Sequence, residues 1–172
     1  LEAGASIEPQ NVIHAARCAT GEHMALLLAH GADPNSHDHR GWAALHAGRN
    51  NVDATRLLLE AGARADTATT RRDDGCPGHP PTALGMTPLM LLAEEGFVAP
   101  RARDVVRLLL KYGAELDAED EDGHSAEFYA REKMEVYDSA TREDAKYEET
   151  GAARPLKQTL VFFAAVRAAG SW

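Results

Sequence analysis

A five-residue phrase, Leu-Glu-Ala-Gly-Ala or a close variant of it, recurs along this chain. Its copies occupy residues 1–5, 28–32, 59–63 and 110–114, and three leucines lead into each copy after the first. The glycines of successive copies are 27, 31 and 51 residues apart. Repetition at such a spacing is the signature of a stacked array of units, each of ~33 residues. The first two spacings therefore predict one unit each, and the third predicts a unit with an insertion.

Local signals predict that each unit contains two helices. In the third unit, Thr87 is placed to cap a helix whose first position is Pro88, and both residue types are preferred at those positions. Gly96 supplies the left-handed backbone that ends such a helix. A second helix is expected over residues 104–112, because its apolar residues recur with i, i+3, i+4, i+7 spacing. Gly113 ends this helix, and the polar segment after it reverses the chain.

These motifs resemble those of the ankyrin-repeat family. The family pattern is a turn glycine, Thr-Pro-Leu-His-x-Ala on the first helix, Leu-Leu-Leu on the second, and Gly-Ala-Asp before a hairpin-like turn. The segments that carry the resemblance are residues 12–16, 31–35, 41–47 and 85–90. The resemblance implies an all-α, ankyrin-type helical solenoid of about four to five helix-turn-helix repeats, with β-hairpin-like loops and partial end repeats. It also implies that His14 and His46 hydrogen-bond within or between repeats.

We interpret residues 1–172 as a single ankyrin-repeat domain, with units expected at about 1–36, 37–66, 67–118 and 119–172. The third unit has a Pro/Gly-rich finger, residues 67–84, in place of a short hairpin, and a second small insertion at 97–103. Insertions in repeat arrays map to loops on one face, often the binding face. The finger is therefore either a functional loop or a passive variation.

The last unit departs further from the pattern. Glu127 occupies a position where a core leucine is expected, and a charged insertion follows at residues 132–153. Its charge and low apolar content favour an irregular segment. An apolar helix from about 155 to 169 then closes the array. Because the first copy of the phrase begins in mid-repeat, we expect the chain to be a fragment of a larger protein.

The net charge of −9 is unevenly distributed, because residues 1–112 carry −2 and residues 113–172 carry −7. A nucleic-acid binder neutralises phosphates with a basic surface, so DNA, RNA and anionic membranes are disfavoured partners. The partner expected instead is another protein or peptide, one with a basic patch. With two distant cysteines there is neither a disulfide framework nor a zinc cluster. An intracellular location, cytoplasmic or nuclear, fits this cysteine content.

No catalytic, metal or cofactor site is predicted. The chain has no glycine-rich phosphate loop, no Gly-x-Ser-x-Gly turn and no His-Glu-x-x-His helix. His37 and His39 lack further ligands nearby, so they are interpreted as polar surface of a hairpin tip. The acidic run 115–123 fails the calcium-loop pattern, so it is interpreted as a solvated hairpin. Cys18 is expected to be a small, buried core residue.

The resemblance implies a partner-binding surface formed by the hairpin tips and the outer side of the first helices, which line a concave face. Trp42 has two open interpretations, as an exposed binding residue or as a ring packed beneath the finger. Arg71 and Arg72 on the finger are placed to meet an acidic partner. The expected partner-binding residues are His39, Arg40, Trp42, Arg71, Arg72, Met86, Glu94, Glu95, Glu121, Asp122 and His124.

The resulting prediction is a non-enzymatic protein–protein interaction module that works as a rigid scaffold. Rigid display limits the entropy that is lost when a partner docks. Two alternatives stay open. The domain is an accessory part that positions a substrate for a catalytic domain elsewhere in a larger protein, or it is itself a substrate. In the second case Asn35 is the relevant residue, because it occupies the hairpin asparagine that intracellular hydroxylases modify in similar repeats.

Overall fold

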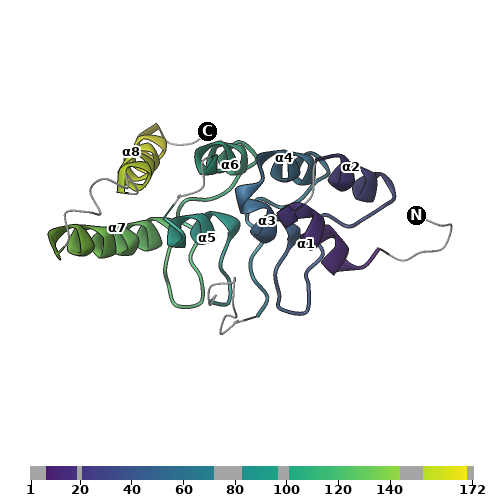
Figure 1. Ribbon diagram of the computed structural model, residues 1–172, viewed down its shortest axis with the longest axis horizontal. Helices are drawn as coiled ribbons and strands as arrows, with labels where there is room; N and C mark the ends of the chain where they lie inside the picture. Colours follow the sequence, from purple (N-terminus) through teal and green to yellow (C-terminus); the bar gives the residue numbers. More distant parts are fainter. Residues whose placement is uncertain (1–6, 19–20, 72–82, 97–100, 144–152, 170–172) are drawn as a thin grey trace.

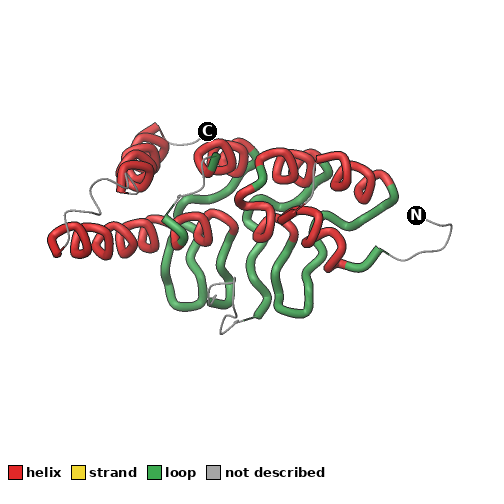
Figure 2. Tube along the Cα trace, viewed as in Figure 1, coloured by secondary structure: helices red, strands yellow, loops and turns green. Residues whose placement is uncertain are grey.

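The computed structural model describes residues 7–18, 21–71, 83–96, 101–143 and 153–169 and arranges their helices in two rows (Figures 1 and 2). The described residues form α-helices, one 3₁₀ helix and two isolated antiparallel bridges, His37–Ala43 and Glu119–Ser125. The all-α solenoid is therefore confirmed. The inner row contains α1 (Pro9–Cys18), α3 (Ala44–Ala47) with η1 (Gly48–Asn50), α5 (Pro88–Glu94) and α7 (Ala126–Glu143). The outer row contains α2 (Gly21–Ala29), α4 (Val52–Glu60), α6 (Ala102–Lys111) and α8 (Ala153–Ala169).

The boundaries of the helices follow from local chemistry. The Thr87 hydroxyl accepts a hydrogen bond from the backbone N–H of Met90 at 3.3 Å, and Pro88 occupies the first turn, as predicted. Asn51 caps α4 in the same way by accepting from Ala54 at 3.1 Å. The glycine of the recurring phrase ends α2, α4 and α6 with a positive φ, which is 84° at Gly31, 90° at Gly62 and 91° at Gly113.

The core runs along the stack between the two rows. Leu45, Leu58, Leu89 and Leu109 come from four different helices, and each is at most 1% exposed. Burying one such side chain contributes about 1.5–3 kcal/mol to stability. A single unit has too few of these residues to form its own core, so the units depend on one another.

Three loops connect the units and project from the inner row, on the side away from the outer helices (Figures 1 and 2). We call residues 30–43, 61–87 and 112–125 the first, second and third hairpin; residues 72–82 of the second lie outside the described part. Side chains link each hairpin to the next. Asn35 Oδ1 accepts from the Arg64 N–H at 2.9 Å, and Asn35 Nδ2 donates to the Gly62 carbonyl. Asp66, four residues after its own glycine like Asn35, accepts from the Glu115 N–H at 2.8 Å.

Two insertions account for the 51-residue spacing. Two residues, 39 and 40, separate Asp38 from Gly41 in the first hairpin, whereas fifteen, 70–84, separate Thr69 from Gly85 in the second. The helices of that unit are also farther apart in sequence. Leu45 and Leu59 are 14 residues apart, and the equivalent leucines 89 and 110 are 21 apart. The predicted finger and the smaller insertion therefore both interrupt an otherwise regular unit.

His46 joins the second unit to the third. Its Nδ1 accepts from the Ala43 N–H at 2.9 Å, which leaves the proton on Nε2, and Nε2 donates to the Met86 carbonyl at 3.0 Å. The hydrogen-bonding role expected for His46 is therefore confirmed. Met90 occupies the equivalent position of the next unit, where its sulfur accepts weakly from the Thr87 N–H at 3.4 Å. A methionine can thus replace the local bond but has no donor for the next repeat.

The last unit differs from its prediction. The expectation of an irregular segment over 132–153 is wrong for residues 132–143, because α7 continues through Glu143. Its glutamates, alanines and methionine favour helix, and α7 packs against both α5 and α8. Residues 144–152 lie outside the described residues. The helix expected from about 155 begins at Ala153, as α8.

Glu127 is tolerated at the leucine position because it forms ion pairs. Arg131 donates to its carboxylate from the next turn, at 2.9 Å, and Arg167 of α8 donates to its other oxygen. The bonds from Arg131 and Arg167 lower the pKa of Glu127. Arg167 also binds Asp117 of the third hairpin. Asp117 has the position of Asn35 and Asp66 in its unit, so α8 continues the inter-unit contacts at the end of the array.

On the inner-row helix α1, two expectations fail. Cys18 is exposed rather than buried, and His14, for which a hydrogen bond was expected, is exposed as well. The reason is helical geometry, because α1 buries Val12, Ile13 and Ala16, and residues 14 and 18 share the opposite face.

We predict that His46 makes the stability of the protein pH-dependent. Its burial lowers its pKa from 6.5 to about 4. As the pH falls below 6.5, the unfolded state binds a proton that the folded state refuses, so the free energy of unfolding decreases by about 3 kcal/mol by pH 4. His46→Met is the matched control, because Met90 shows that the position accepts methionine. The measurement is urea unfolding of the original chain and of His46→Met at pH 7 and pH 4.5. The prediction is contradicted if the free energy of unfolding decreases equally in both proteins between these pH values.

Candidate partner-binding site

The three hairpins share one closing geometry. In the first, Asp38 donates its N–H to the Trp42 carbonyl, and its carboxylate accepts from the Trp42 N–H at 2.9 Å. Asp120 makes the same pair of bonds with His124 in the third hairpin. In the second, Thr69 makes them with Met86, its hydroxyl accepting at 3.0 Å. The finger is thus inserted into a hairpin of ordinary base geometry, and that base fixes where it begins and ends.

Neighbouring hairpins also contact one another near their tips. The Thr70 N–H donates to the Gly41 carbonyl at 3.0 Å, and Arg71 Nη1 donates to the His39 carbonyl at 2.9 Å. On the other side, the Glu121 N–H donates to the Leu84 carbonyl at 3.0 Å. The three hairpins therefore form one continuous edge along the inner row.

The predicted site residues fall into three groups. His39, Arg71, Glu121 and Asp122 are exposed on this edge, and Arg40 and His124 are half-buried there. Arg72 lies outside the described residues. The remaining four, Trp42, Met86, Glu94 and Glu95, lie at the base of the hairpins and on the inner row.

Trp42 and Met86 are only 2% and 1% exposed, so the expectation that they contact a partner is wrong. The guanidinium of Arg49 lies 5.3 Å from the centre of the indole ring, and the ring of His46 lies 6.1 Å from it. Trp42 is therefore packed rather than exposed, and its contacts include Arg49 and His46. Packing of this ring beneath the finger stays a prediction, because residues 72–82 lie outside the described residues.

Arg49 is the residue that sequence reasoning missed. It is 8% exposed, donates to the His46 carbonyl at 2.8 Å and forms an ion pair with Glu95 of the next unit. Glu95 is thereby committed to holding two units together. Glu94 beside it is half-buried, and burial raises its pKa.

The third hairpin presents acidic groups beside aromatic rings. Asp120, expected to be solvated, is 7% exposed and accepts from two backbone N–H groups and from the Tyr129 hydroxyl. Burial and this bond to Asp120 raise the pKa of Tyr129. The ring of His124 stacks on Phe128, with centroids 3.8 Å apart, and Phe128 is 41% exposed.

An exposed stripe continues from this hairpin along α7. Phe128, Glu132 and Val136 follow one another at i, i+4 spacing, and Glu135 adjoins them. Val136 is 57% exposed, and both glutamates are exposed. We call Glu121, Asp122, His124, Phe128, Glu132, Glu135 and Val136 the acidic–aromatic surface. Glu132, Glu135 and Val136 escaped prediction because residues 132–143 were not expected to be helical.

Within the described residues, no group of three or more His, Cys, Asp or Glu side chains is placed to hold a metal ion. The described helices also include none that is long and apolar enough to cross a membrane.

A family model described as Ankyrin repeats (3 copies) matches residues 12–120. No curated protein matches the chain. The family match begins within α1, covers α2 to α6 and ends at Asp120, which closes the third hairpin.

We predict that the first hairpin needs a glycine at position 41, because the backbone of Arg71 in the second hairpin lies against it. Both Gly41 and Gly31 have φ above 80°, which costs a residue with a Cβ about 1–2 kcal/mol. A Cβ at Gly41 would also lie 2.6 Å from the Arg71 nitrogen, whereas one at Gly31 meets nothing within 4 Å. Gly41→Ala should therefore lower the free energy of unfolding by about 3 kcal/mol and Gly31→Ala by about 1. Equal losses in urea unfolding would show that the close approach is absent.

Proposed function

The chain belongs to the ankyrin-repeat family, and from this premise we propose that it is a non-enzymatic scaffold that binds a partner protein through its hairpin edge and the acidic–aromatic surface. Ankyrin repeats are generally protein–protein interaction modules, and the family is typically non-enzymatic. The observation that carries the proposal is the stacking of the half-buried His124 ring on the exposed ring of Phe128, beside Glu121 and Asp122.

The chemistry of this surface favours a basic and partly apolar partner. Aromatic side chains are enriched among the residues that dominate binding energy, and Phe128 supplies apolar area without being needed in the core. The surrounding carboxylates add steering and selectivity for a basic patch on the partner. This part of the chain also carries most of the net negative charge, −7 over residues 113–172.

The arrangement of the hairpins favours rigid binding. Backbone and side-chain hydrogen bonds between neighbouring hairpins hold the edge in one conformation before a partner arrives. Little ordering entropy then opposes association. At the other end of the edge lie Arg71, which is positively charged, and the polar side chain of His39. A partner that spans all three hairpins would therefore present basic groups toward Glu121 and acidic groups toward Arg71.

We predict that Asp122→Lys and Phe128→Ala each weaken binding of a captured partner about tenfold. The first reverses a charge at the rim, and the second removes an exposed aromatic contact worth about 1–2 kcal/mol. Both side chains are exposed, so the fold should be retained. The matched control is Glu22→Lys, because Glu22 is an exposed acid on the outer helix α2.

The measurement begins with a photo-crosslinking amino acid at position 122 or 22 of the whole protein in its native cells. Cross-linked partners are identified by mass spectrometry, and their affinities for the purified variants are then determined. Partners that cross-link at position 122 and bind less tightly to both variants support the assigned surface. Partners whose affinity changes only with Glu22→Lys place binding on the outer helices and refute it.

A further inference from the structure

The outer row opens between its last two helices. α2 packs closely on α4, and α4 on α6, but α8 packs against α7 and makes far fewer contacts with α6 (Figure 1). Leu156, Phe163 and Val166 bury one face of α8. Arg167 fixes the end of α8 through Asp117 and Glu127. The helix is therefore anchored to the inner row, and a gap remains on its α6 side.

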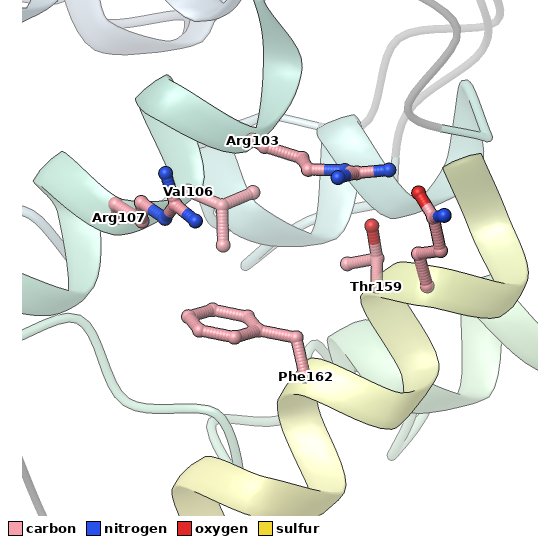
Figure 3. Close-up of a pocket in the computed structure, with 6 residues that line it drawn as sticks. Arg103, Val106, Arg107, Thr159 and Phe162 are labelled. Carbon is pink, nitrogen blue, oxygen red and sulfur yellow. The ribbon is translucent and has the colours of Figure 1, made fainter.

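A cavity of about 160 Å³ occupies this gap. Figure 3 shows Arg103, Val106 and Arg107 of α6 on one side and Thr159 and Phe162 of α8 on the other. Val106 is 1% exposed and Phe162 is half-buried, so these two side chains form an apolar base between polar walls. Sites for whole small-molecule ligands usually measure about 300–1,000 Å³. The cavity is instead suited to a single apolar side chain of a larger partner.

The rim of the cavity is basic. Arg103 is exposed, and the side chain of Arg107 is 62% exposed with an ion pair of 3.8 Å to Asp104. Exposed pairs at such distances contribute little, so the guanidinium donors of Arg107 stay accessible to another anion.

A second hollow, between α4 and α6, shares Arg107 with the cavity and extends this charge. Its lining includes Arg56, Arg101 and Lys111, with Asp104 as its acidic member. A basic belt thus crosses the outer row of a chain whose net charge is −9. Positive charge concentrated on an otherwise acidic molecule favours an acidic partner at this place.

We propose that the gap between α6 and α8 is a docking site for an acidic peptide segment of a partner protein. An apolar side chain of the peptide inserts between Val106 and Phe162, and flanking carboxylates bind Arg103 and Arg107. Guanidinium groups match carboxylates in geometry and can donate two parallel hydrogen bonds to each. The site lies on the outer row, away from the hairpins, so it is separate from the acidic–aromatic surface and selects the opposite charge.

A peptide fits these observations better than a nucleic acid. The cavity admits one apolar side chain, whereas single-stranded nucleic acids bind along extended grooves with aromatic rings that stack on successive bases. The acidic residues of 113–172 would also repel a long polyanion that extended beyond the belt.

The test uses a dye-labelled peptide, Glu-Asp-Leu-Glu-Asp, and fluorescence anisotropy with the full chain. The double variant Arg103→Glu/Arg107→Glu should bind this peptide about tenfold more weakly than the original chain, because it reverses both contacting charges. Arg17→Glu/Arg64→Glu has the same net charge and alters two exposed arginines elsewhere, so it should bind normally. Replacing the leucine of the peptide by alanine should weaken binding about fivefold through lost burial.

Circular dichroism melting verifies that both double variants are folded, and their exposed positions make this the expected result. The proposal is overturned if the acidic peptide does not bind at millimolar concentration, or if both double variants weaken it equally. It is also overturned if a single-stranded oligonucleotide binds the same arginines more tightly than the peptide does. The effect of Asp122→Lys on cross-linked partners tests the hairpin edge, whereas the peptide assay tests the gap between α6 and α8. Each of the two proposals can therefore be refuted without the other.

Discussion

The hydrogen bonds that tie each hairpin to the next are the interactions on which the rest of this structure depends. Two-helix units cannot bury a core alone, so they need neighbours in a fixed register. Asn35 reaches the Arg64 backbone at 2.9 Å, Asp66 reaches Glu115 at 2.8 Å, and Asp117 meets the Arg167 side chain of α8. Residues at the same position of three units thus make these contacts. Asn35 and Asp66 hold the next hairpin, and Asp117 holds the last helix, α8. Each of these contacts joins only adjacent units, and the same kind of contact recurs along the array. An insertion can therefore be accommodated wherever it leaves them intact.

The two insertions of the third unit satisfy that condition. Thr69 closes the second hairpin with the geometry that Asp38 and Asp120 provide in the others, so thirteen additional residues leave its base unchanged. The tips of the hairpins can therefore differ in length and sequence while the geometry of their bases stays the same. The two proposed binding surfaces follow from the end of the array. There, α7 extends past the stack with exposed Phe128 and Val136, and α8 stands apart from α6.

Sequence predicted the elements whose signals are local. Thr87, Pro88, Gly96 and Gly113 act within one turn of the chain, and their predicted roles are confirmed. The environment of Trp42 could not be read in this way, because its cover includes Arg49, which is held by Glu95 46 residues farther along. The glutamates, alanines and methionine of α7 favour helix, but its packing against α5 and α8 is a contact between units that the sequence does not reveal. Local chemistry thus determined what could be foreseen, and contacts between units determined the rest.

Amide hydrogen exchange measures directly whether the hairpins are held together before any partner binds. Arg64 and Glu115 are exposed residues, so their amides would exchange rapidly if the bonds to Asn35 and Asp66 were absent. We expect both amides to exchange more than about tenfold slower than unprotected ones. We also expect Asn35→Ala to restore fast exchange at Arg64 while Glu115 stays protected. Fast exchange at both amides in the unmodified chain would contradict this expectation.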